Sequence, residues 1–145
     1  MINIFRPTAL AATISLALVA PAFAESDLVT VVTSENPQTQ LMAMVLTTQA
    51  VEQGADARIL LCGPGGDLAL ADAPEAATAP QPPRAASPQG MLQALMGRGV
   101  TVEVCAIYLP GLGAEANVLL EGIGVAQPPA MAGAMMAEGT RVWSF

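Results

Sequence analysis

Cys62 and Cys105 are the two side chains of this sequence best suited to covalent chemistry. Cys62 follows an apolar run and Cys105 follows a stretch of alternating valines. Each is therefore expected at or near the carboxyl end of a strand, where the active crevice of a parallel sheet lies. Backbone N–H groups of the following turn or helix could stabilise a thiolate at that edge. The other interpretation is that both cysteines are small buried hydrophobes. The chain has no histidine, which excludes Ser-His-Asp and Cys-His catalysis and imidazole metal sites.

A glycine-rich turn, Gly63-Pro64-Gly65-Gly66, comes directly after Cys62. Its backbone amides could approach an anion or a sulfur species, but the turn matches neither a GxGxxG nor a Walker sequence. A tight strand-to-loop turn is the simpler interpretation. The carboxylates are scattered and show no pair typical of general acid and base catalysis. We therefore predict no cofactor.

The order of the strands decides whether Cys62 and Cys105 can form a disulfide. A disulfide needs Cα atoms within about 7 Å of each other. If the strands predicted at 58–62 and 100–107 are neighbours, the two cysteines can meet. If the strand predicted at 28–33 lies between them, they are about 10 Å apart and cannot bond directly. The sequence leaves both orders open.

Several methionines offer a second kind of soft ligand. A thioether copper site is conceivable outside the cytoplasm, but filling of the core is the favoured interpretation, and we predict no metal site. The methionines that fit helix faces are Met42, Met91, Met96, Met131, Met135 and Met136.

Residues 1–24 have the pattern of a cleavable secretory signal peptide. Arg6 provides a positive start, 9–20 is apolar but shorter than the roughly 20 residues of a membrane span, and Ala22-Phe23-Ala24 matches an A-x-A cleavage site. We predict cleavage after Ala24, a single mature domain at 25–145 with no membrane span, and a periplasmic location.

The charge of the chain bears on its partners. Twelve acidic residues stand against five basic ones, which gives a formal net charge of −7. Removal of the signal peptide would make the net charge more negative, because Arg6 leaves with it. A surface of this kind repels phosphate backbones, so we expect no nucleic-acid partner.

Predicted strands and helices alternate along the mature chain. This alternation predicts an α/β fold with three layers, in which helices cover both faces of a five-stranded, mainly parallel sheet. The Ala- and Pro-rich segment 72–87 is predicted to be a flexible loop. The strands are expected at 28–33, 58–62, 100–107, 123–126 and 140–144. The helices are expected at 37–53, 88–96, 114–121 and 128–138.

Two stretches carry a resemblance to a known family. Val100-Thr101-Val102-Glu103-Val104-Cys105 with Ala106, and the stretch from Leu119-Leu120-Glu121-Gly122-Ile123 through Trp143-Ser144-Phe145, resemble the DsrE/DsrF-like family. The resemblance implies a small parallel α/β fold of the flavodoxin-like topology class and a homo-oligomer, a trimer or a hexamer. In the sulfur-relay members, the cysteine at the position of Cys105 holds a sulfane sulfur as a persulfide.

The chain departs from the relay pattern in two ways. Relay members often have an arginine-containing, glycine-rich stretch just after the cysteine, whereas Ala106-Ile107-Tyr108-Leu109-Pro110-Gly111 contains no base. Cys62 is not part of the relay motif.

The resemblance implies a periplasmic protein that handles or transfers sulfur through a persulfide on Cys105, with Cys62 as a resolving or second thiol. One alternative is a non-catalytic oligomeric module that binds a small ligand or a partner at the 63–66 rim and has structural cysteines. A Met/Cys metal chaperone is a third hypothesis. Neither the sulfur donor nor the acceptor can be named from the sequence.

Overall fold

A computed structural model describes residues 27–145, and the predicted signal peptide lies outside them. The strands are β1 (Asp27–Val32), β2 (Asp56–Leu61), β3 (Thr101–Val104), β4 (Gly124–Val125) and β5 (Arg141–Ser144). The α-helices are α1 (Pro37–Glu52), α2 (Glu75–Thr78), α3 (Pro88–Met96), α4 (Tyr108–Leu112) and α5 (Pro128–Met136). Two 3₁₀-helices are η1 (Gly63–Ala69) and η2 (Ala116–Val118). No helix in this part of the chain is long and apolar enough to cross a membrane.

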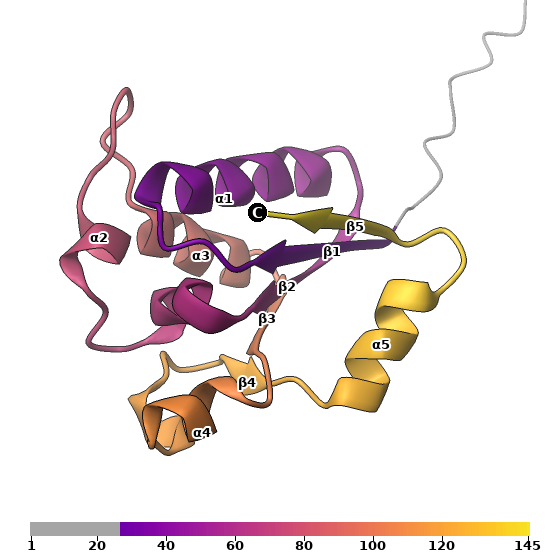
Figure 1. Ribbon diagram of the computed structural model, residues 1–145. Coiled ribbons are helices and arrows are strands. Elements are labelled where there is room, and N and C mark those ends of the chain that lie inside the picture. Colours follow the sequence, from indigo (N-terminus) through magenta and orange to yellow (C-terminus); the bar gives the residue numbers. More distant parts are fainter. Residues whose placement is uncertain (1–26) are drawn as a thin grey trace, which may run out of the picture.

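The five strands form one sheet in the order β4-β3-β2-β1-β5, and all neighbours are parallel. The steps from β1 to β4 all run in one direction, so right-handed crossovers place their connections on one face. The step from β4 back to β5 runs the other way and places α5 on the opposite face (Figure 1). The predicted three-layer α/β fold with a five-stranded sheet is confirmed.

Alternation along the strands produces two cores. Ile59 and Leu61 of β2 are fully buried in the larger core, on the side of α1 and α3. Leu60, one residue out of phase, lies in a smaller core that Met131 of α5 helps to form. A strand that is buried on both faces has a continuous apolar sequence, as β2 has at Ile59-Leu60-Leu61.

Local signals fix both ends of α1. The Asn36 side chain accepts hydrogen bonds from the backbone N–H groups of Gln38 and Thr39 at 2.9 and 3.1 Å. Pro37 follows at the first helical position, where its missing N–H removes no helical bond. Gly54 has a φ of +94°, the left-handed conformation that ends many helices.

The helix predicted at 114–121 is wrong. The chain instead forms α4 at Tyr108–Leu112, which includes Pro110 and Gly111, and only the 3₁₀ turn η2 beyond it. Leu119 forms an antiparallel bridge with Leu70, and the Leu120 N–H donates to the Ala69 carbonyl at 2.8 Å. Pairing with the end of η1 therefore overrides the helix propensity of this segment.

The segment predicted to be a loop at 72–87 contains some regular structure. It includes the short helix α2, whose Ala77 is 1% exposed, and an antiparallel bridge between Gln81 and Ala86. The segment leads into α3, which Ser87 caps by accepting the Gly90 N–H at 3.1 Å. Its flexibility stays a prediction.

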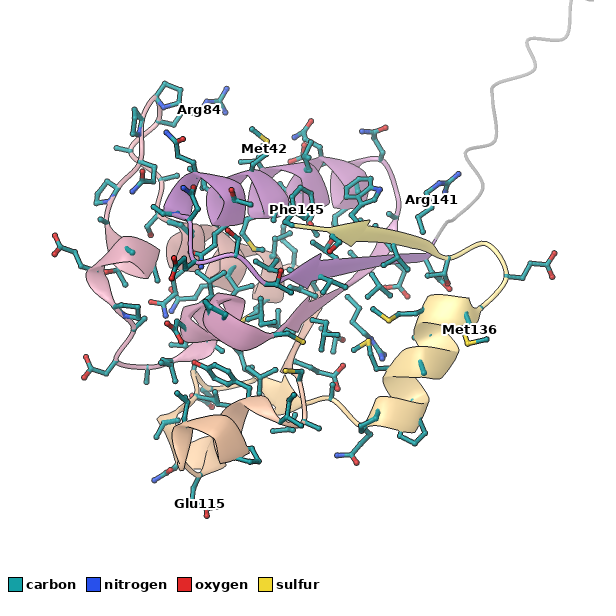
Figure 2. The ribbon with its side chains drawn as sticks, in the orientation of Figure 1. Met42, Arg84, Glu115, Met136, Arg141 and Phe145 are labelled. Atoms are coloured by element: carbon teal, nitrogen blue, oxygen red, sulfur yellow. The ribbon has the colours of Figure 1, made fainter. Side chains whose placement is uncertain are left out.

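The methionines divide between core and surface. Met131 is buried, but Met42 and Met136 are 51% and 85% exposed, so the expectation that both fill the core is wrong. Figure 2 shows these two side chains on the outer faces of α1 and α5.

We predict that Gly65→Ala destabilises the fold by about 1–3 kcal/mol, the range for overpacking. A Cβ at Gly65 would collide with the backbone carbonyl of Val32, which cannot move without disturbing β1. Gly133→Ala in α5 is the matched control, because its Cβ meets nothing within 4 Å and alanine favours a helix. The free energy of unfolding from urea titration checks both; equal stabilities for the two variants would contradict the prediction.

Candidate functional site

The pairing of β2 with β3 sets the two cysteines side by side. Leu61 pairs with Val104, and Cys62 and Cys105 are the next residues on the two strands. The Cys105 N–H donates to the Leu61 carbonyl at 2.8 Å, so the ladder continues past the last paired residues. Neighbouring strands lie about 4.8 Å apart. Of the two strand orders left open by the sequence, the structure has the one that brings the cysteines together.

Both cysteine side chains contact the smaller core, on the face of the sheet that α5 covers. The buried residues of this core are Val29, Leu60, Ala126 and Met131. Cys105 packs against the larger core as well, whereas Cys62 does not. Both are free thiols of intermediate exposure.

Cys105 lies at the end of β3, next to the point where the connections that follow neighbouring strands leave to opposite faces of the sheet. After β3 the chain turns toward the larger core, in which Tyr108 and Leu109 of α4 are buried. After β4 it turns to α5 on the opposite face (Figure 1). Such a switch point at the carboxyl edge is where open α/β sheets form their ligand crevice.

The local environment holds Cys62 in its protonated form. Burial, followed by the hydrogen bond and the negative charge of Cys105, raises the pKa of the Cys62 thiol from 9.0 to about 12. A hydrogen bond from the Cys105 backbone opposes this rise. When one of two interacting thiols ionises, the other can remain S–H and donate to it. The arrangement therefore keeps the Cys62 thiol protonated beside Cys105.

A cavity of about 460 Å³ opens at Cys105. Of the two cysteines, Cys105 lines it and Cys62 does not. The lining residues come from the β1–α1 connection, η1, the end of β3 and α4: Glu35, Gly63, Pro64, Asp67, Cys105, Ile107, Tyr108, Gly111 and Leu112.

A hydrogen bond between η1 and α4 shapes this cavity. The Tyr108 hydroxyl donates to Asp67 Oδ1 at 2.7 Å. Burial, followed by the Asp67 carboxylate, raises the pKa of Tyr108 above its usual value, so the hydroxyl keeps its proton. Gly66 lies against the Tyr108 ring so closely that a Cβ would collide with it. The glycine-rich turn is thus a packing surface for Tyr108.

The cavity carries negative charge without a basic partner. Glu35 and Asp67 line it, and no arginine among residues 27–145 does so. Arg58 and Arg98 pair with Glu103 and Glu52 at 3.7 and 3.3 Å. Figure 2 shows Arg84 at the tip of the 81–86 turn and Arg141 at the start of β5, both away from α4.

Sequence reasoning identified both cysteines but missed Glu35, Asp67 and Tyr108. The available signals were weak: Tyr108 is the only tyrosine of the chain and follows Cys105 by three residues, and Asp67 follows the glycine-rich turn. Within the described residues, no group of three His, Cys, Asp or Glu side chains could hold a metal ion.

The chain is therefore an α/β protein with a parallel sheet and a thiol pair at its carboxyl edge. Two solved structures have a similar fold. A protein of unknown function, MTH1491 from Methanobacterium thermoautotrophicum, aligns with a TM-score of 0.61 at 18% identity, covering 83% of this chain and 100% of that one. The ychN protein from E. coli aligns with a TM-score of 0.66 at 18% identity, covering 83% and 99%.

Comparison of the sequence with protein-family models finds no match. None of the curated proteins matches either. The structural likenesses agree with the fold that the DsrE/DsrF-like resemblance implies, and at this identity they establish the fold alone.

We predict that Cys62 alkylates slowly up to strongly alkaline pH. In Cys105→Ser, burial still raises its pKa, so at a given pH less thiolate is present than for a free cysteine. Iodoacetamide labelling should keep accelerating beyond about pH 10, whereas the same variant unfolded in urea should level off about one pH unit above its ordinary pKa of about 8.5. A plateau of the folded variant at the pH of the unfolded one would contradict the prediction.

Proposed function

We propose that this protein is a sulfur carrier that holds a sulfane sulfur as a persulfide on Cys105. The observation that carries the proposal is the place of Cys105: a free thiol at the switch point of the sheet, facing a cavity, with a second thiol beside it. The resemblance to the DsrE/DsrF-like family and the matching fold support it.

The transfer is written as two thiol exchanges. The Cys105 thiolate attacks the outer sulfur of a donor persulfide R–S–SH; the donor S–S bond breaks, and its electron pair leaves with R–S⁻. Cys105–S–SH remains. An acceptor thiolate then attacks the outer sulfur, forms its own persulfide and releases the Cys105 thiolate. Sulfur moves without net oxidation, and no cofactor is consumed.

Cys62 supports the carrier role as a hydrogen-bond donor. To resolve the persulfide, a Cys62 thiolate would attack the Cys105 sulfur, form a Cys62–Cys105 disulfide and expel HS⁻. That attack requires ionised Cys62, and its raised pKa makes this form scarce near neutral pH. The persulfide is therefore retained for transfer, and resolution by Cys62 is the slower branch.

The apolar mouth of the cavity suits a protein acceptor. Ile107 and Leu112 line it and are 78% and 50% exposed. Exposed apolar side chains beside a reactive group are typical of a contact surface. A homo-oligomer, as the resemblance implies, stays a prediction for which these side chains are candidate contacts.

The alternative of a module that binds small anions at 63–66 is less well supported. Gly65 and Gly66 are buried, and the Gly65 N–H donates to the Cys62 carbonyl at 3.1 Å. Glu35 and Asp67 beside the turn would repel an anion.

Export to the periplasm is the second part of the proposal. It rests on the sequence of 1–24 and on the predicted cleavage after Ala24.

We predict that the wild-type protein gains the mass of one sulfur atom when its reduced form is incubated with polysulfide in 0.3 M salt, about the ionic strength that screens exposed charges. The adduct should persist in Cys62→Ser and disappear in Cys105→Ser, as intact mass measures. These two variants are matched controls, since each removes one sulfur. An adduct retained in Cys105→Ser would contradict the proposal, and loss of two hydrogens from the wild type would make resolution by Cys62 the main branch.

We predict that full-length protein expressed in a Gram-negative bacterium is recovered from the periplasmic fraction with Glu25 as its first residue. N-terminal sequencing measures the cleavage site. The control is Ala22→Lys with Ala24→Lys, which breaks the A-x-A pattern and should leave uncleaved chain. Full-length protein in the cytoplasmic fraction would refute export.

A further inference from the structure

We propose that Glu35 and Asp67 make the Cys105 cavity selective against anionic sulfur donors. The donor it accepts then carries its sulfane sulfur among uncharged or basic groups, as a persulfide on a neutral or basic protein surface would, and dianions such as thiosulfate are disfavoured. This inference rests on the proposed function, because it names the substrate class of the same thiol.

The charge distribution of the site carries the argument. Cys105, Glu35 and Asp67 line one cavity, so a donor that reaches the thiol enters the field of both carboxylates. In the described part of the chain, no arginine shares that cavity. Two of the four arginines at 27–145 pair with carboxylates elsewhere, Arg58 with Glu103 and Arg98 with Glu52. Among these described residues, no basic side chain lines the cavity to offset the charge of its two carboxylates.

Glu35 and Asp67 have different surroundings, so the effect of each charge can be tested by its own substitution. Asp67 is half-buried and already accepts the Tyr108 hydroxyl at 2.7 Å, a bond that holds it at the cavity wall. Glu35 is exposed. Its replacement tests the charge without disturbing the Asp67–Tyr108 bond. Asp67→Asn retains an oxygen that can accept the same bond.

The inference is tested by thiol–disulfide exchange, which needs no persulfide. Cys105–S⁻ attacks R–S–S–R to give Cys105–S–S–R and R–S⁻. The probes are 5,5′-dithiobis(2-nitrobenzoate), which is a dianion, 4,4′-dithiodipyridine, which is neutral, and cystamine, which is a dication. Rates are measured in the Cys62→Ser background, where Cys105 is the only thiol, and each is divided by the rate of 2-mercaptoethanol with the same probe.

At low ionic strength we expect Glu35→Gln and Asp67→Asn each to raise the relative rate of the dianion by about two- to threefold, the effect of one charge pair several ångströms apart in a wet site. The double variant should combine the two increases, the neutral probe should change little, and the dication should slow. Glu115→Gln is the matched control: it removes the same charge from the far side of α4, outside the cavity (Figure 2), and should change no rate appreciably. Added salt should raise the dianion rate of the parent toward that of the double variant.

Equal dianion rates in the parent and the double variant would overturn the inference, as would an equal increase in Glu115→Gln. Because Glu35→Gln leaves the Asp67–Tyr108 bond in place, it keeps the test valid even if Asp67→Asn fails to fold. Charge selectivity without any persulfide adduct in the mass experiment would refute the proposed function and leave only a charge-selective cavity beside the thiol. A persulfide adduct without charge selectivity would support the proposed function and overturn this inference.

Discussion

The in-register parallel pairing of β2 with β3 is the constraint on which the candidate site depends. Side chains alternate along a strand, so a slip of one residue would turn every side chain of one strand to the other face. Leu61 and Val104 are both fully buried in the larger core, and a slip would remove one of them from it. The burial of these residues therefore fixes Cys62 beside Cys105. Packing of the larger core therefore determines which side chains meet at the carboxyl edge of the sheet.

The wall of the cavity also depends on core packing, because the buried ring of Tyr108 positions the hydroxyl that bonds Asp67. Tyr108 is 7% exposed, and its ring belongs to the larger core while its hydroxyl reaches Asp67 at 2.7 Å. That contact is possible only because Gly66 leaves room for the ring. A buried tyrosine with a satisfied hydroxyl joins η1 to α4, two segments far apart in the sequence. Gly66 of the turn thus allows the Tyr108 ring to approach the backbone of η1 closely.

The sequence predicted the fold class well because its signals are local or periodic. Asn36 and Pro37 mark the start of α1, and the apolar runs mark the strands. The failure at 114–121 has a non-local cause, since the bridge from Leu119 to Leu70 depends on where η1 ends. The cavity was missed for the same reason. Glu35, Asp67 and Tyr108 follow three different strands, and only the strand order brings them to one edge.

The proposed compartment and the proposed chemistry constrain each other. The cysteines directly follow a paired position of two neighbouring strands. Neighbouring strands lie about 4.8 Å apart, a disulfide allows up to roughly 7 Å between Cα atoms, and oxidising compartments favour disulfides between such thiols. Oxidation would remove the Cys105 nucleophile. A carrier in the periplasm therefore requires slow oxidation of the pair or a partner that reduces it. In the proposed carrier, attack by Cys62 would be the slow step of oxidation through the persulfide, since its raised pKa keeps it protonated. The environment that makes Cys62 a poor nucleophile would thus protect a sulfur held on Cys105.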